Sequence, residues 1–136
     1  MYAKILVPID LAHVETGKKA IDIAQKLLDK DGTIYLVNVV EDIPTYIAAE
    51  MPISMLQDSK DQSLAELKAT AKAAGIKAKC EVRSGRPASS ILDAAEEHEA
   101  GLIVIASHRP GFSDYFLGST AARVVRHAQC PVFVDR

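Results

Sequence analysis

The sequence predicts an α/β protein in which a parallel sheet is covered by helices on both faces. Short apolar runs alternate with amphipathic segments along the 136 residues, and the connections between them are mostly short. Strands that alternate with helices imply parallel pairing and right-handed crossovers. The composition, 49% hydrophobic and 25% charged, suits one domain that buries a core. We therefore expect residues 1–136 to form a single domain with the order βαβαβαβαβ.

The first third of the chain predicts a strand, a helix and a second strand. Lys4–Ile9 is a short apolar run, which is typical of a fully buried strand. Glu15–Lys30 predicts a helix that ends at Asp31–Gly32, and Thr33–Val40 predicts the next strand. The apolar positions at helical spacing are Ala20, Ile23, Ala24, Leu27 and Leu28.

The middle of the chain predicts a connection, a helix and a polar strand. Residues 43–56 contain two prolines and show no clean period, so we expect a connection there. Ser59–Ala74 predicts a helix closed by Gly75. Ile76–Arg83 predicts a strand whose polar character places it near an edge of the sheet.

The last third predicts two further helix and strand pairs. Gly85-Arg-Pro87 predicts the start of a helix, because proline suits a first helical turn. Gly101–Ala106 predicts the fourth strand, Gly118–Ala128 the fourth helix and Pro131–Val134 the last strand.

The overall charge and the cysteines exclude several classes of protein. A net charge of -2 and a pI near 6.1 argue against a nucleic-acid binder that relies on a basic surface. We see no signal peptide and no apolar run of membrane-spanning length, so we expect a cytoplasmic protein without a membrane partner. Cys80 and Cys130 are far apart and are expected to be reduced, buried thiols.

Polar residues follow three of the predicted strands. Asp10, Glu41–Asp42 and Ser107-His-Arg109 lie where ligands bind in parallel α/β sheets, beyond the carboxyl ends of the strands. Gly118-Ser-Thr120 opens the helix that follows the fourth strand. Helix N-termini leave backbone N–H groups free and carry a partial positive charge, so this end of the sheet predicts an anion site.

Four segments of the chain resemble the universal stress protein family. They are Ile5-Leu-Val-Pro-Ile-Asp10, Gly85-Arg-Pro87, Ala106-Ser-His-Arg-Pro110 through Leu117-Gly-Ser-Thr120, and Val125-Arg-His-Ala-Gln-Cys-Pro-Val-Phe-Val134. The sequences of the last two segments resemble those of the short bacterial family members of the F and G type.

The resemblance implies a Rossmann-like domain of the adenine nucleotide alpha hydrolase-like type, with strand order 3-2-1-4-5. It also implies an ATP site, with or without Mg²⁺, and a homodimer in which the last strands pair, with a tetramer as a further option. The cofactor-binding residues expected on this basis are Pro8, Ile9, Asp10, Val39, Ala106, Ser107, His108, Arg109, Gly118, Ser119 and Thr120.

The glycine loop departs from the family pattern. That pattern has a glycine, two residues, a second glycine, nine residues, and then glycine with serine or threonine. Here Ala106 and Arg109 replace the first two glycines, and only eight residues, Pro110–Leu117, precede Gly118. Glycines let the backbone approach an anion closely, whereas arginine offers a charged five-donor fork. Arg109 could therefore hold phosphate by its side chain or point into solvent.

Several expected site residues have a structural alternative. Asp10 could meet ribose or a metal ion, or it could cap the following helix. Ser119 and Thr120 could bind phosphate and also cap their own helix. His108 could be a general base, but no nucleophile is visibly paired with it, so a hydrogen bond to phosphate or backbone is favoured. We assign no catalytic residue and no metal ligand.

Other polar and apolar residues suggest surfaces. We expect three histidines to lie on the surface or at an interface, namely His13, His98 and His127. Arg86 is expected to lie in solvent or near the loop. Arg123 and Arg126 are expected to share one exposed face of the last helix. The apolar part of 43–56 could form a lid or subunit contact, or fold onto the core. The apolar strand Val132–Val134 would be covered by a partner strand.

The expected function is an ATP-binding, nucleotide-responsive regulator in the stress response, with at most slow ATP hydrolysis and a protein partner that the sequence does not identify. The alternative is a dimeric protein-interaction module that binds no nucleotide, which the altered glycine pattern favours. A true ATPase or nucleotidyl transferase and a flavodoxin-like carrier are weaker hypotheses.

Overall fold

The computed structural model describes residues 1–41, 44–107 and 117–136. The elements in chain order are β1 (Tyr2–Pro8), the 3-10 turn η1 (Leu11–His13), α1 (Val14–Leu27), β2 (Leu28–Val40), α2 (Thr45–Ala48), α3 (Ile53–Ala73), β3 (Ala78–Ser84), α4 (Pro87–Glu97), β4 (Leu102–Ala106), α5 (Ser119–His127) and β5 (Val132–Asp135). The five strands form one parallel sheet in the order β3-β2-β1-β4-β5. The predicted fold class and strand order are confirmed.

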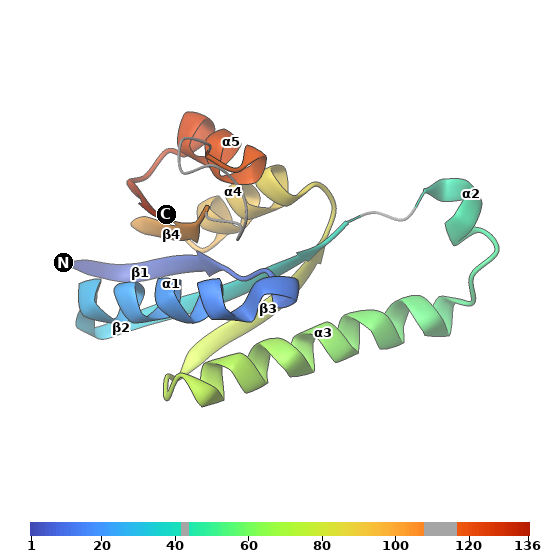
Figure 1. Cartoon of the computed structure of the whole chain (residues 1–136), viewed down its shortest axis with the longest axis horizontal. Helices are drawn as coiled ribbons and strands as arrows, with labels where there is room; N and C mark the ends of the chain where they lie inside the picture. The colour runs from blue at the N-terminus through green and yellow to red at the C-terminus, as the bar shows by residue number, and fades with distance from the viewer. Residues whose placement is uncertain (42–43, 108–116) are drawn as a thin grey trace.

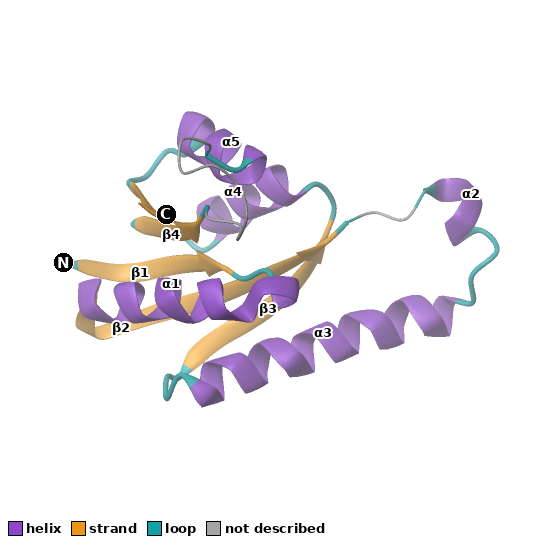
Figure 2. Cartoon of the chain, in the orientation of Figure 1, coloured by secondary structure: helices purple, strands orange, loops and turns teal. Residues whose placement is uncertain are grey.

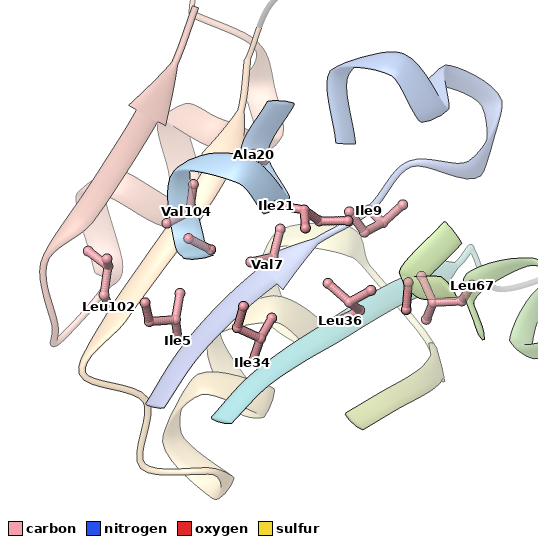
Figure 3. Packing of buried hydrophobic residues seen from close by; sticks show 12 residues of the cluster. Ile5, Val7, Ile9, Ala20, Ile21, Ile34, Leu36, Leu67, Leu102 and Val104 are labelled. Carbon is pink, nitrogen blue, oxygen red and sulfur yellow. The ribbon is translucent and has the colours of Figure 1, made fainter. Parts of the chain in front are cut away.

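Helices cover both faces of the sheet, as Figures 1 and 2 show. α1 and α3 pack on one face, and α4 and α5 pack on the other. Because successive side chains of a strand point to opposite faces, β1 contributes side chains to the hydrophobic layers on both faces of the sheet. Ile5 and Val7 pack beneath α1 and α3, whereas Leu6 packs beneath α4 and α5. Figure 3 shows the first of these layers, with Leu36 of β2 beside Leu67 of α3.

The boundary between α1 and β2 differs from the prediction. The helix ends at Leu27, and Leu28 already has an extended backbone with φ -79° and ψ 137°. Leu28 pairs with Tyr2, and the register then shifts before Lys4 pairs with Thr33. Gly32 is therefore part of this irregular strand and does not end a helix. A Cβ on Gly32 would lie 2.8 Å from the carbonyl oxygen of Ala3, so the close approach of the strands requires glycine.

The segment after β2 is more helical than the sequence predicted. α2 is a short helix, and α3 begins at Ile53 rather than at Ser59. Pro52 precedes the first helical residue and no proline follows within α3, so nothing interrupts the helix from there. α3 ends just before Gly75, as predicted. The other predicted boundaries agree with the structure to within two residues.

The turn from β3 into α4 requires Gly85. Its φ of 141° is strained for any other residue, and its N–H donates to the carbonyl oxygen of Val40 at 3.0 Å. Pro87 is the first residue of α4, which confirms the helix start predicted from Gly85-Arg-Pro87.

A polar network occupies the side of β3 that faces α4. The Arg83 guanidinium donates to Glu81 at 2.9 Å and to Glu97 of α4. His98 lies 3.0 Å from Glu81 and stacks on the ring of Tyr35, with centroids 4.3 Å apart. His98 was predicted to be an ordinary surface or interface residue. That prediction is wrong, because the side chain holds the end of α4 against the sheet.

The two cysteines are half-buried and free. Burial raises the pKa of both the Cys80 and the Cys130 thiol, which keeps them protonated near neutral pH. In the described part of the chain, no helix is both long enough and apolar enough to cross a membrane.

Candidate functional site

A cavity of about 260 Å³ lies beyond the carboxyl ends of β1, β2 and β4. It reaches both faces of the sheet, from the start of α1 to the starts of α4 and α5. Its lining residues are Pro8, Ile9, Asp10, His13, Thr16, Gly17, Val37, Asn38, Val39, Glu41, Pro87, Ile91, Ile105, Ala106, Ser107, Gly118, Thr120 and Ala121. The cavity lies at the point where strand order reverses, which is where parallel α/β sheets bind ligands.

Hydrogen bonds fix the floor of the cavity between β1 and β2. The Ile9 N–H donates to the carbonyl oxygen of Val37 at 2.8 Å. The buried Asn38 side chain donates from Nδ2 to the carbonyl oxygen of Ile9 at 2.9 Å. Both backbone groups of Ile9 are thus paired within the protein, and the chain direction at Asp10 is set.

Asp10 caps the 3-10 turn that leads into α1. Its Oδ1 accepts a hydrogen bond from the Ala12 N–H at 2.9 Å. This is the structural alternative that the sequence offered for Asp10. The carboxylate is exposed and lines the cavity, so the cap leaves it able to meet a ligand as well.

The N-terminus of α5 opens without a side-chain cap. Gly118 is the N-cap residue, and glycine has no side chain that could accept a hydrogen bond from the first turn. Ser119 and Thr120 already lie inside the helix, so the prediction that they cap it is wrong. Thr120 lines the cavity, whereas Ser119 is exposed and does not. Among the described residues, the first turn of α5 therefore presents backbone N–H groups that no N-cap side chain satisfies.

Ser107 places an unpaired hydroxyl beside this helix start. Among the described residues, its Oγ is the one buried side-chain polar atom without a hydrogen-bond partner. Leaving a buried hydroxyl unpaired costs about 1–3 kcal/mol. Ser107 also lines the cavity. An acceptor or donor in the cavity would remove this cost.

The fold itself does not require glycine at position 118. Its φ of -57° and ψ of 150° are ordinary for any residue. A Cβ there would make only an ordinary contact, 3.5 Å from the carbonyl oxygen of Ser107. The missing side chain instead leaves the backbone of the helix start open to close approach from the cavity.

The described walls of the cavity carry more negative than positive charge. Asp10 and Glu41 contribute carboxylates, and no lysine or arginine is among the described lining residues. Arg86, at the N-cap of α4, is exposed. The described residues contain no group of three or more histidine, cysteine, aspartate or glutamate side chains that could hold a metal ion.

The cavity brings together most of the residues expected at the site. Eight of them line it, namely Pro8, Ile9, Asp10, Val39, Ala106, Ser107, Gly118 and Thr120. His108 and Arg109 lie outside the described residues, so the choice between a phosphate-binding and a solvent-facing Arg109 stays a prediction.

Four of the lining residues were not assigned to the site from the sequence. His13, Thr16 and Gly17 reach the cavity from η1 and α1, and Asn38 reaches it from β2. Asn38 carried a usable signal, because an amide inside an apolar strand needs a partner when it is buried. The others are ordinary helix residues, and only the packing of α1 against the sheet places them here.

Comparison with known proteins identifies relatives along the whole chain. The universal stress protein family matches residues 1–136. Universal stress protein MJ0531 of Methanocaldococcus jannaschii is 33% identical, across 98% of this chain and 82% of the relative. Universal stress protein G of Shigella flexneri is 30% identical across the full length of both chains.

Solved structures show the same fold. Protein MJ0577 superimposes with a TM-score of 0.81 at 23% identity, with 98% of this chain and 95% of that chain covered. A universal stress protein in complex with cAMP gives a TM-score of 0.66 at 24% identity, with coverage of 99% and 97%. The Archaeoglobus fulgidus protein in complex with dAMP gives 0.60 at 21%, with coverage of 99% and 98%. With the family match and relatives at 30% identity or more along the chain, this protein belongs to the universal stress protein family.

Proposed function

We propose that this protein binds ATP in the cavity at the carboxyl ends of β1, β2 and β4, and works as a nucleotide-responsive regulator in the stress response. The observation that carries the proposal is the buried Ser107 hydroxyl, which has no hydrogen-bond partner among the described residues. It lines a cavity that also includes the start of α5, where the N-cap residue is a glycine. Free N–H groups at a helix start and an available hydroxyl are the donors that phosphate oxygens require.

The remaining lining residues suit the other parts of a nucleotide. Val39 and Pro8 offer an apolar wall between β1 and β2 for adenine, and Asp10 offers a carboxylate to ribose hydroxyls. Structural neighbours in the family have been solved with cAMP and with dAMP, which are adenine nucleotides. In this proposal the phosphates lie at the α5 end, near Ser107 and Thr120.

Magnesium and hydrolysis take a secondary place in the proposal. Since the described residues lack a cluster of metal ligands, Mg²⁺ would arrive with the nucleotide and be met by the Asp10 carboxylate. Among the described residues that line the cavity, no side chain is paired in a way that would activate a water molecule. We therefore expect ATP hydrolysis to be slow or absent.

A calorimetric titration with ATP tests the proposal directly. We expect binding heat and a rise in the melting temperature of the protein at millimolar ATP, because a ligand that binds only the folded state stabilises it. Parallel titrations with AMP and GTP test whether the phosphates and the adenine both contribute. Neither heat nor a thermal shift with any of these nucleotides would contradict the proposal.

The variant Ser107→Ala separates the ligand role of the hydroxyl from a structural one. It removes an unpaired buried hydroxyl, so the free energy of unfolding of the ligand-free protein should stay constant or rise. Loss of a hydrogen bond to a charged phosphate, about 1.5–3 kcal/mol, should weaken ATP binding roughly tenfold to a hundredfold. Ser89→Ala on the exposed side of α4 is the matched control. A less stable variant with unchanged ATP affinity would refute the assigned role.

The alternative is a dimeric interaction module that binds no nucleotide. The replacement of two loop glycines by Ala106 and Arg109 favours it, because these side chains restrict close approach of the backbone to phosphate. The ATP titration decides between the two functions, since the interaction module predicts no response to any nucleotide.

We further propose a cytoplasmic homodimer in which β5 strands pair antiparallel across a two-fold axis. β5 is an edge strand, and Phe133 exposes 42% of its surface. A partner strand would cover this edge and satisfy its outward backbone groups.

A further inference from the structure

Residues 44–62, which comprise α2 and the first part of α3, form an arm that extends away from the sheet (Figure 1). None of these residues is buried, and from position 53 to 62 all but Leu56 are exposed. The same helix becomes buried only from Leu67 onward, where it packs on the sheet. The arm thus lacks a packing surface in its own chain.

The arm concentrates apolar surface. Tyr46 is 75% exposed, Ile47 40%, Ile53 84% and Met55 55%. These are four of the seven large hydrophobic residues that are exposed in the described part of the chain. A helical segment of a few turns is marginal in water without tertiary packing. The arm therefore needs a partner surface to be stable as a helix.

The arm is also acidic, whereas the outer face of α5 is basic. The arm carries Glu50, Asp58 and Asp61 against Lys60, a net charge of -2. α5 carries Arg123 and Arg126 and no acidic residue, a net charge of +2. Both arginines are exposed, and they flank Val125, which is 45% exposed. Each surface therefore exposes apolar area, and the net charge of one surface is opposite in sign to that of the other.

The arm projects from one end of the molecule, whereas α5 lies over the sheet at a distance from it, so the arm does not reach α5 of its own chain (Figure 1). We propose that the arm docks on the outer face of α5 in a second copy of this chain. Under a two-fold axis each pair of chains makes this contact twice, which doubles the buried area. The contact uses the helix face of α5 and leaves the free edge of β5 to its own pairing. With both interfaces the chain would assemble beyond a dimer.

A charge-reversal cycle tests the contact by sedimentation velocity over a wide range of protein concentration. Glu50→Lys with Asp58→Lys reverses the arm, and Arg123→Glu with Arg126→Glu reverses α5. Each pair places like charges opposite each other and should raise the dissociation constant of the arm contact by about tenfold or more. The fourfold variant restores opposite charges and should recover the association.

Matched variants control for net charge and for folding. Asp22→Lys with Asp31→Lys makes the same change in charge at exposed positions outside both surfaces, and should leave association unchanged. Ile53→Gln with Met55→Gln keeps helix propensity but removes apolar contact, and should weaken association without any charge change. Thermal unfolding of every variant confirms the fold.

The outcomes divide clearly. Recovery in the fourfold variant after loss in both double variants supports the contact. Association that is absent in the wild type, or the same in all variants, overturns it. Loss in each double variant without recovery in the fourfold one also overturns it, because the arm would then dock elsewhere. Association that persists unchanged through all the charge variants and is lost only in a β5 variant overturns the arm contact and assigns the association to the strand interface.

Discussion

The edge strand β3 carries Lys79, Glu81 and Arg83 on one face, whereas β5 at the opposite edge presents Val132, Phe133 and Val134. At the end of α4, Glu97 accepts a hydrogen bond from Arg83, and His98 lies 3.0 Å from Glu81. The side chains of Glu81 and Arg83 are 30% and 19% exposed, so this network is partly shielded from solvent. Phe133, by contrast, is 42% exposed, and among the described residues no helix covers it.

The difference implies that β3 is an edge protected against pairing, whereas β5 is an edge suited to pair with another strand. Charged side chains discourage another strand from pairing with an edge, whereas an apolar edge invites pairing. The hydrogen bonds between β4 and β5 show which backbone N–H and C=O groups of β5 point toward the open edge of the sheet. Ile103 N–H donates to Pro131 and Ser107 N–H donates to Asp135, so the backbone groups of Val132 and Val134 point away from β4.

The largest expected effect comes from Val134→Pro. Proline removes an N–H that points outward, so the bonds to β4 remain while pairing with a partner strand is blocked. Two lost bonds across a two-fold axis, with the added ring clash, should weaken the β5 interface by more than about 2 kcal/mol. Sedimentation equilibrium measures this, with Val134→Thr as the control that keeps the N–H. Unchanged association in Val134→Pro would show that β5 does not pair.

A smaller effect is expected when the protected edge is opened by Arg83→Met. The change removes the donor to Glu81 and Glu97 while retaining apolar packing along the stem. Because the network is partly exposed, we expect a loss of only about 1 kcal/mol in the free energy of unfolding. Urea denaturation measures it against Lys77→Met, an exposed control just before β3. A loss no larger than that of the control would show that the network does not fasten this edge.

The smallest effect is a pH dependence at the same edge. The hydrogen bond from Arg83 holds the pKa of Glu97 below its ordinary value of 4.5. A carboxyl with a lowered pKa stabilises the folded state above its ordinary pKa, and this contribution disappears as the pH falls through the lowered value. Wild type should therefore exceed Glu97→Gln in stability near neutral pH, and the gap should close in acid. A gap that is constant with pH would contradict the ion pair.

The hydrophobic pattern was sufficient to predict most elements, because buried strands and amphipathic helices leave distinct periods. It failed at Leu28, which suits either a helix or a strand. Pairing with Tyr2, a contact between distant parts of the chain, decided for the strand. It also failed at 53–58, where two nearby prolines and the lack of a clean period obscured a helix that starts after Pro52.

The candidate site divides in the same way. Asp10, Ser107 and Gly118 follow strands or open a helix, and that position alone predicted that they would meet at one end of the sheet. The capping role expected of Ser119 and Thr120 depends on where the helix begins. The extended backbone of Gly118 makes it the N-cap residue, so Ser119 is already the first helical residue. His98 is bound by Glu81 and Tyr35, partners that no local pattern indicates.

The sequence by itself determined the class of fold, the polar end of the sheet and the apolar last strand, since hydrophobic periodicity and the alternation of strands with helices can be read along the chain. Only the tertiary structure decided that the Ser107 hydroxyl is buried without a partner among the described residues, and that a side chain on Gly118 would meet only an ordinary contact. It also decided that the arm at 44–62 leaves the core. These properties depend on which surfaces meet after folding, and burial exists only once they have met.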